Sequence, residues 1–358
     1  MGDFIVELAA NAHPVHVAAG ALDRLGELAR AAGLKPARAA LVTDSNVAPL
    51  YGDRAARALR AAGFDPAIVV VAAGEASKSL ATLATVYDRL ADAGLDRSSA
   101  IFALGGGVVG DLAGFAAATW MRGIAVAQIP TTLVAQVDSA LGGKTGINHP
   151  SAKNLIGAFH QPRLVVADVA TLATLPEREF REGLAEAIKY GAIMDAPMVA
   201  ALEAAMPAIL RREPATLAEI VERSLRHKAF VVQSDEREGG LRKILNFGHT
   251  IGHALEASAG YGSLLHGEAV AIGMGAATAL SRACANLPAP DATRLLGLIE
   301  AAGLATRLPA GWRGAEFDRA LKLDKKRAGA GVEFVLIDRL GHAFTRELGF
   351  DEIIAALA

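Results

Sequence analysis

The chain has 358 residues, of which 52% are hydrophobic, so it can bury a large core and disorder is excluded. Its 36 Lys and Arg residues stand against 38 Asp and Glu residues, and a formal charge of -2 gives no reason to expect a nucleic acid or an anionic membrane as partner. The single cysteine, Cys284, excludes an internal disulfide framework and fits a reducing compartment. Asp3 stands where a secretory signal needs basic residues, and no long apolar run follows it, so we expect a cytoplasmic protein.

Short β-rich runs alternate with helical patterns in the first half of the chain. Residues 39–43, 68–71, 100–104, 126–129 and 164–167 are almost continuously apolar, and glycine, aspartate or threonine lies at or soon after the end of each run. Such runs are typical of strands that are buried on both faces of a parallel sheet. The pattern predicts an N-terminal α/β nucleotide-binding domain with a parallel sheet.

Strand patterns become rare after Thr174, where long stretches with helical spacing begin, apart from a β-rich run at 333–337. Leu175-Pro176 breaks the preceding element, which sets the boundary. We therefore expect domains over 1–175 and 176–358, the second mainly α-helical. The apolar segment 264–285 contains His266 and Glu268, among other polar residues, which favours a core helix over a membrane span.

A glycine-rich stretch, 105–111, follows an apolar run and opens a helical one. This order lets free backbone N–H groups face a phosphate, although a plain tight turn is the alternative. Residues 138–145 end like a P-loop but carry Asp138 where the first glycine must be, so they are not a Walker motif. Lys144 and Lys153 can meet an anion as point charges, whereas a lysine taken alone is more typical of the exposed surface.

Polar residues also end two of the predicted strands, at 43–46 and 130–132. Short oxygen side chains at these positions can cap the following helices without any ligand. The carboxyl ends of strands in an open α/β sheet are, however, where such folds bind ligands. Both interpretations stay open at these positions.

Histidines and a carboxylate gather in the second half. His249 and His253 are four residues apart, which puts both on one face of a helix, and His266 and Glu186 supply a third imidazole and a carboxylate. Imidazoles with a carboxylate and one open position are the donors of catalytic zinc. Spacing alone does not exclude His253 from the coordination shell, and the pattern is not the His-Glu-x-x-His of metalloproteases.

The sequence also places cations near this cluster. Lys189 follows Glu186 by three residues, and Arg242 precedes His249 by seven. Lys228 and residues 325–327 add further positive charge. Helix surfaces commonly carry such residues, but a substrate with a carboxylate and a phosphate would need them.

Taken together, these motifs closely resemble the 3-dehydroquinate synthase family, within the sugar phosphate cyclase group, over the whole chain. The resemblance implies zinc, or cobalt, held by Glu186, His249 and His266, with His253 as a proton-handling group outside the shell. The implied NAD-binding residues are Asp44, Asn46, Glu75, Lys78, Gly107, Val108, Asp111, Thr131, Thr132, Asp138, Lys144, Lys153, Thr171 and Thr174. The implied substrate-binding and catalytic residues are Arg122, Lys144, Asn154, Lys189, Lys228, Arg242, Asn246, His253 and Lys326. The motifs that carry the resemblance lie at 105–111, 130–132, 142–145, 153–157, 184–191, 245–253 and 266–268.

The same resemblance implies a lyase of the shikimate pathway, which leads to chorismate and the aromatic amino acids. Its reaction converts 3-deoxy-D-arabino-heptulosonate 7-phosphate to 3-dehydroquinate and phosphate, with NAD reduced and reoxidised within one turnover. Family members are usually homodimers, in which Arg122 would act across the interface.

Three alternatives remain. Other sugar phosphate cyclases share the NAD and zinc motifs, but Arg242 and Asn246 favour a substrate that bears a carboxylate. Metal-dependent dehydrogenases of the glycerol dehydrogenase type usually carry aspartate where Glu186 stands. A catalytically silent dinucleotide-binding protein is the third alternative, and none of the expected motifs is missing.

Overall fold

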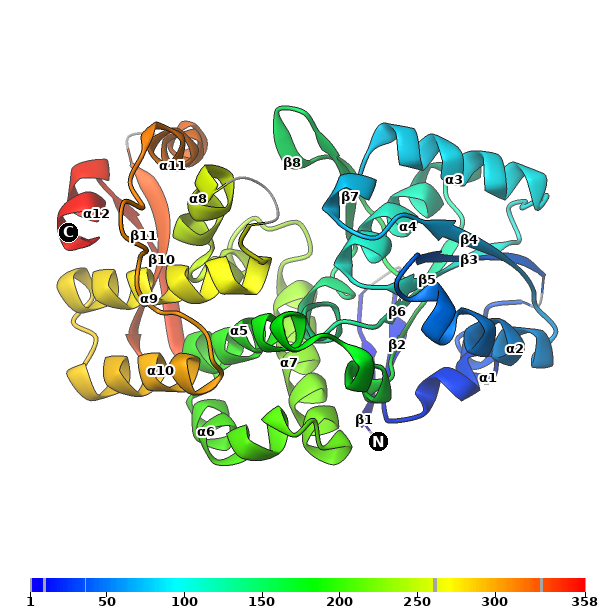
Figure 1. Ribbon diagram of the computed structural model, residues 1–358, viewed down its shortest axis with the longest axis horizontal. Coiled ribbons are helices and arrows are strands. Elements are labelled where there is room, and N and C mark those ends of the chain that lie inside the picture. The colour runs from blue at the N-terminus through cyan, green and yellow to red at the C-terminus, as the bar shows by residue number, and fades with distance from the viewer. Residues whose placement is uncertain (1, 9–10, 36, 260–262, 329–330, 358) are drawn as a thin grey trace. The chain divides into compact units, whose positions relative to one another are not determined.

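The computed structural model describes residues 2–8, 11–35, 37–259, 263–328 and 331–357, without the side chains of 322–328. These residues form two compact units, whose elements are labelled in Figure 1. The first unit comprises Met1–Leu175 together with Leu217–Gln233, and the second comprises Pro176–Thr216 and Ser234–Ala358. Neither unit is therefore a single continuous segment of the chain.

The first unit is built on a seven-stranded sheet with the order β1-β2-β9-β6-β5-β3-β4. All neighbouring strands pair in parallel except β1 and β2, which are antiparallel. The predicted parallel α/β fold is confirmed, and all five predicted strands lie in this sheet, whereas β1 and β2 were not predicted. The strands are β1 (Gly2–Val6), β2 (His13–Val17), β3 (Arg38–Asp44), β4 (Asp65–Val71), β5 (Ala100–Gly105), β6 (Ala125–Pro130) and β9 (Leu164–Ala167).

Alternate residues of the central strands enter two different cores. In β3, Ala39 and Leu41 pack with helices α1 and α2, while Ala40 and Val42 pack with α3 and α4. Side chains of a strand point alternately to its two faces, so a strand covered by helices on both sides must be apolar throughout. Figure 1 shows the two helix pairs on opposite faces of the sheet. These helices are α1 (Leu25–Ala31), α2 (Asp53–Ala61), α3 (Leu80–Asp92) and α4 (Gly107–Thr119).

A buried glutamine connects the segments that follow the carboxyl ends of β6 and β9. Gln136 lies in a short helix (Ala135–Ser139), and its Nε2 lies 3.0 Å from the carbonyl oxygens of Pro130 and Asp168. The same atom lies 3.1 Å from Oγ1 of Thr171, in the 3₁₀ helix Val169–Thr174. Because buried backbone carbonyls need partners, this one side chain fixes the relative positions of these segments.

Two further features of the first unit were not predicted. Residues 144–159 form an antiparallel hairpin of β7 (Lys144–His149) and β8 (Ala152–Phe159). Helix α7 (Pro214–Ser234) comes from the helical half of the chain, yet most of it packs with the sheet unit. The guanidinium of Arg226 in α7 lies 4.5 Å from the ring centre of Phe4 in β1, which is one of the contacts that hold it there.

The second unit is mainly helical, as predicted, with one hairpin of β10 and β11. Helix α9 lies at its centre and contacts α5, α8, α10, α12 and β10. Close approach of α8 and α9 requires a glycine, because a Cβ on Gly273 would lie 1.9 Å from the carbonyl oxygen of Gly248. The elements are α5 (Glu177–Met194), α6 (Ala196–Leu210), α8 (His249–Ala259), α9 (His266–Cys284), α10 (Ala289–Ala301), α11 (Ala315–Ala328), β10 (Val332–Arg339), β11 (His342–Leu348) and α12 (Phe350–Leu357).

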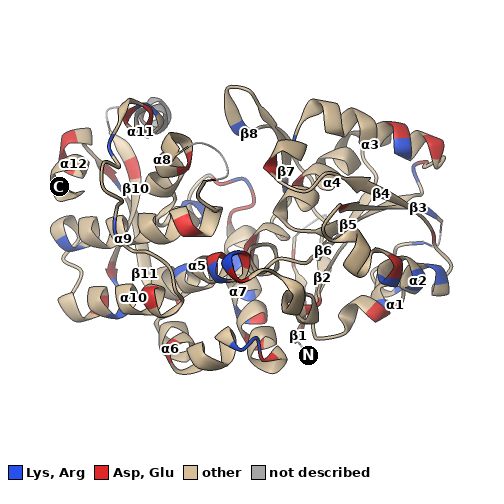
Figure 2. Cartoon of the chain, in the orientation of Figure 1, with Lys and Arg blue, Asp and Glu red and all other residues tan. Residues whose placement is uncertain are grey.

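The predicted core helix at 264–285 is α9, and most of its residues are buried. Within the described part of the chain, no helix has the length and hydropathy needed to cross a bilayer. Figure 2 shows that residues of both signs of charge are spread over both units.

Asp168 provides a test of how the first unit is held together. Its fully buried carboxylate accepts hydrogen bonds from the backbone N–H groups of Gly20 (2.8 Å), Leu22 (3.0 Å) and Ala170 (3.0 Å). We expect Asp168→Ala to lower the free energy of unfolding by about 2–4 kcal/mol in urea titrations, because buried N–H groups lose their acceptor. The control is Asp23→Ala, which removes an exposed ion pair with Arg54 and should change stability by less than about 1 kcal/mol. Equal losses in the two variants would contradict this account.

Candidate functional site

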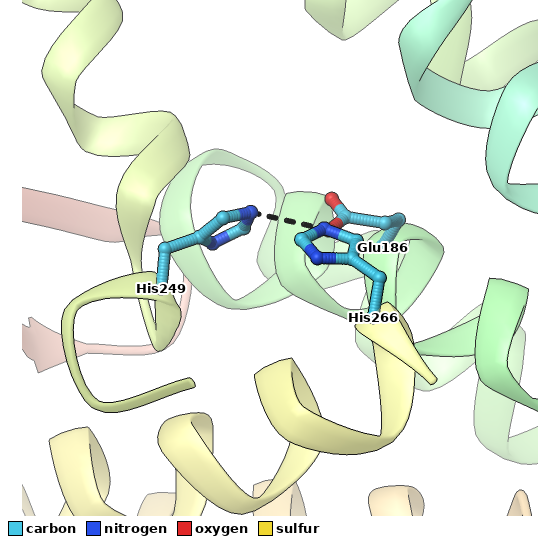
Figure 3. Close-up of side chains that lie close together, drawn as sticks. All are labelled: Glu186, His249 and His266. Atoms are coloured by element: carbon cyan, nitrogen blue, oxygen red, sulfur yellow. Dashed lines mark ion pairs between the residues drawn. The ribbon is translucent and has the colours of Figure 1, made fainter. Parts of the chain in front are cut away.

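Three side chains from three helices of the second unit converge in the structure. Glu186 lies in the middle of α5, while His249 and His266 are the first residues of α8 and α9. Nε2 of each histidine lies 3.4 Å from Oε1 of Glu186, and Figure 3 shows the side chains gathered around one point. Their donor atoms all lie within 4.8 Å of one another. The geometry brings together the three residues that the sequence suggested as metal ligands.

The carboxylate of Glu186 is 1% exposed and lies beside the ammonium of Lys189 and the Nε2 atoms of His249 and His266. Burial raises the pKa of this carboxyl, but the ammonium of Lys189 and the imidazole of His249 outweigh it and hold the pKa well below its usual range. Lys189 is itself buried and forms an ion pair with Glu186. A buried carboxylate beside two imidazoles offers the donors that a divalent cation takes.

The surroundings shift the pKa values of the two histidines in opposite directions. Burial and the charge of Lys189 lower the pKa of His249 in spite of Glu186, which favours the neutral ring that a metal ligand needs. For His266, burial alone would lower the pKa, but the carboxylates of Glu186 and Glu256 raise it to about 10. A metal ion bound here would displace that proton, so binding would release a proton and weaken as the pH falls.

His253 lies one turn after His249 on α8, as its spacing predicts. Its ring centre is 5.3 Å from that of His249 and 5.9 Å from that of His266. His253 is exposed, and with Glu256 and His266 it forms a second group whose donor atoms lie within 4.8 Å. His253 therefore lies next to the three candidate ligands. The sequence did not point to Glu256, which follows His253 by three residues on the same helix.

Further polar residues of the second unit lie on the segment that precedes α8. Arg242 is 2% exposed, and its Nη1 donates to the carbonyl of Glu236 at 2.6 Å. Nδ2 of Asn246 lies 3.4 Å from Oε1 of Glu238, a residue that sequence reasoning missed and that has a φ of +63°. Arg242 is thus a buried cation held by the backbone. The side chain of Lys326 lies outside the described part of the chain.

All the residues expected to bind the dinucleotide lie in the first unit. Most of them lie in segments that end or follow β3, β4, β5, β6 and β9, whereas Lys144 begins β7 and Lys153 lies near the start of β8. Two of the expected residues accept local backbone N–H groups without any ligand: Asp44 accepts from Asn46 (2.8 Å) and Val47 (3.0 Å), and Thr132 accepts from Ala135. No side-chain oxygen caps α4 at Gly106, so the glycine-rich turn keeps backbone N–H groups available for an anion.

A buried lysine, Lys78, lies at the centre of a second group of polar side chains in the first unit. Nζ of Lys78, which is 5% exposed, donates to Asp111 at 2.6 Å and to the side chain of Asn154. Burial raises the pKa of Asp111, and the charge of Lys78 opposes that shift. Asn148, which the sequence did not suggest, donates to Glu75 at 2.7 Å and accepts from the N–H of Asn154 at 2.8 Å. These side chains hold one another, and two of them, Asp111 and Asn154, line a cavity of about 300 Å³ together with Lys144.

The remaining residues that the resemblance implied lie at several places in the first unit. Lys228 on α7 donates to the carbonyl and the carboxylate of Asp138, at 2.7 and 2.8 Å, so it belongs to the first unit and not to the helical one. Tyr51 bridges Thr171 and Thr174 through its hydroxyl. Arg122 is exposed and has a φ of +70°, a conformation that non-glycine residues rarely adopt. The others are Gly107 and Val108 at the start of α4, Thr131 directly after β6, and Lys153 on β8.

The chain is similar to known proteins over almost its whole length. Residues 68–182 match the family model for the 3-dehydroquinate synthase N-terminal region, and residues 183–327 match the model for its C-terminal region. A 3-dehydroquinate synthase of Acidithiobacillus ferrooxidans is 48% identical over 343 residues, which are 96% of this chain and 93% of that protein.

Solved structures of other cyclases share the fold. A 2-epi-5-epi-valiolone synthase from Streptomyces hygroscopicus, solved with NAD+ and Zn2+, is 29% identical with a TM-score of 0.87 and covers 98% of this chain and 96% of its own. A 2-deoxy-scyllo-inosose synthase, solved with carbaglucose-6-phosphate, NAD+ and Co2+, is 26% identical with a TM-score of 0.88 and covers 99% of each chain. A glycerol dehydrogenase from Schizosaccharomyces pombe, 18% identical with a TM-score of 0.66 over 96% of this chain and 87% of its own, is similar in fold alone. This chain belongs to the 3-dehydroquinate synthase family.

Proposed function

We propose that the chain converts 3-deoxy-D-arabino-heptulosonate 7-phosphate to 3-dehydroquinate and phosphate, with catalytic NAD and a bound divalent metal ion. The observation that carries this proposal is the buried carboxylate of Glu186 beside His249 and His266, in a chain that matches family members over almost its whole length. The reaction is a step of the shikimate pathway, which supplies chorismate and the aromatic amino acids.

The metal site consists of Glu186, His249 and His266, and zinc is the ion we propose. Two imidazole nitrogens and one carboxylate oxygen are the donors of many catalytic zinc sites and leave a position open for substrate. Cobalt accepts the same donors, so it should replace zinc in the purified protein. When bound, the metal supplies Lewis-acid polarisation of a hydroxyl pair, and the dinucleotide supplies reversible hydride transfer.

For the dinucleotide, the turn before α4 offers uncapped N–H groups to its phosphates. Lys78, Asp111 and Glu75 form a preorganised polar group beside this turn. Because the groups are already held by one another, little ordering is needed when a ligand binds. The other proposed contacts are Asp44, Asn46, Gly107, Val108, Thr131, Thr132, Asp138, Lys144, Lys153, Thr171 and Thr174.

The substrate carries a carboxylate and a phosphate, and the chain has cations for both. Arg242 and Asn246 bind the carboxylate, since a buried guanidinium can form two parallel hydrogen bonds to it. Lys144, Lys189 and Lys326 neutralise the phosphate as it leaves. His253 moves a proton near the metal, while Arg122, Asn154 and Lys228 complete the set of substrate-binding residues.

Two related activities are the alternatives. Another sugar phosphate cyclase would use the same metal and dinucleotide residues on a substrate without a carboxylate, and the buried Arg242 argues against that. A dehydrogenase of the glycerol dehydrogenase type would oxidise its substrate and accumulate reduced dinucleotide. Measurements of phosphate release and of NADH formation separate these cases.

We also propose that the chain works as a homodimer in the cytoplasm, with Arg122 acting across the interface. The exposed position of Arg122, beside the exposed Met121, supports the proposed homodimer. The free Cys284 is compatible with a reducing compartment such as the cytoplasm. A monomeric mass in solution at micromolar concentration would contradict the dimer.

Phosphate release tests the proposed reaction. Purified protein with zinc and a small, fixed amount of NAD should release phosphate from 3-deoxy-D-arabino-heptulosonate 7-phosphate in large molar excess over NAD, with no net rise in absorbance at the NADH wavelength. NADH formed in step with product would support a dehydrogenase instead. Faster phosphate release from glucose 6-phosphate than from the heptulosonate would support another cyclase.

Loss of one ligand tests the metal site. His249→Ala should reduce bound zinc from one equivalent to a small fraction after dialysis, because one of three protein donors is gone. NAD binding, measured by calorimetry, should stay within about threefold of the unchanged protein, since the proposed NAD residues lie in the other unit. Undiminished zinc in this variant would show that the ligands are assigned wrongly.

A further inference from the structure

Helix α9 begins without a capping oxygen at its N-cap residue, Leu265, although Glu268 of α9 accepts from the N–H of Leu265. His266 is its first residue, and the preceding Leu265 has no side-chain oxygen to accept from the first free N–H groups. The N–H of Gly267 instead donates to Oε2 of Glu182 at 2.9 Å, and Glu182 belongs to α5. A residue of a neighbouring helix therefore takes the place of the cap, and its carboxylate meets the positive end of α9.

The backbones of the two helices touch at the same point. A Cβ on Gly267 would lie 2.0 Å from the carbonyl oxygen of Glu182, so only glycine permits this approach. The contact is therefore a fixed point between α5 and α9, made by one hydrogen bond and one close packing of backbone atoms.

This fixed point lies next to two of the proposed metal ligands. Glu182 precedes Glu186 by one helical turn on the same face of α5, and Gly267 directly follows His266. Any shift of α9 along α5 would change the 3.4 Å separation between Nε2 of His266 and Oε1 of Glu186.

A second contact lies one helical turn earlier on the same face of α5. Arg178 donates to both carboxylate oxygens of Glu268 at 2.7 Å and to the carbonyl of Ser263 at 2.9 Å. Oε2 of Glu268 also accepts from the N–H of Leu265 at 2.9 Å. Arg178 is 53% exposed, so this pair adds little stability, and the half-buried Glu182 is the stronger element of the contact.

We propose that Glu182 is a positioning residue: by capping α9 through the N–H of Gly267, it sets His266 at the distance from Glu186 that a metal ion requires. The inference rests on the metal site of the proposed function. Glu182 itself does not touch the metal or the substrate in this account. Groups that orient metal ligands typically change metal affinity about 10–100-fold when they are removed.

Three substitutions of Glu182 separate its role as an acceptor from its charge. Glu182→Leu removes the acceptor, and Glu182→Asp keeps the charge but withdraws the acceptor by one methylene. Glu182→Gln keeps a neutral acceptor at full reach. Glu177→Leu is the matched control, because Glu177 lies on the same helix and pairs with Arg181 at 2.7 Å and Arg212 at 3.0 Å, away from α9.

The probes are Zn2+ and Co2+ titrated into the full-length apoprotein against a chelator. We expect the dissociation constant to rise about 10–100-fold in Glu182→Leu and Glu182→Asp, and to stay within about threefold in Glu182→Gln and Glu177→Leu. The visible spectrum of bound Co2+ should change in the first two variants only, because it reports the ligand geometry. If Leu does not fold, the Asp variant decides.

Unchanged affinity and an unchanged Co2+ spectrum in the Leu and Asp variants would overturn the inference. So would equal losses in Glu182→Gln and Glu182→Asp, since these would point to charge and not to the hydrogen bond. Failure of the unchanged protein to bind either metal would overturn the proposed metal site as well, and this result is distinct because it does not depend on any variant.

Discussion

A carboxylate that is almost fully buried must be compensated, and in the second unit that requirement centres on Glu186. Its neighbours are one buried ammonium, from Lys189, and two imidazoles, from His249 and His266. Removing such groups from water carries a large penalty unless they are paired or bind a metal. The proposed metal ion would compensate the charge of this cluster, which gives a physical reason for the helical unit to keep it.

Helix packing brings these groups together. His249 and His266 each stand at the first residue of a helix, and the two helices approach closely because Gly248 and Gly273 have no side chains between them. A third helix carries Glu186 and meets α9 at Gly267. The positions of the three proposed ligands therefore depend on two close backbone contacts at glycine, one of Gly273 with Gly248 and one of Gly267 with Glu182.

Local patterns in the sequence predicted much of this fold. The five central strands were evident because strands buried on both faces are apolar throughout, as β5 is. The short, partly polar β1 and the hairpin of β7 and β8 were missed, since exposed positions interrupt their apolar runs. Helix α7 packs with the sheet unit through contacts such as Arg226 with Phe4, and contacts between residues so distant in sequence leave no local signal.

The candidate site, like the fold, could be predicted from the sequence only in part. The three ligand candidates were visible as residue types and spacings, but Glu182 and Glu256 were not, because their roles depend on how helices cross. X-ray absorption at the zinc edge of the purified, zinc-loaded protein tests the central claim most directly. The account predicts a shell of two imidazole nitrogens and low-Z oxygen donors, including a carboxylate. A shell with sulfur, or without imidazole, would contradict it.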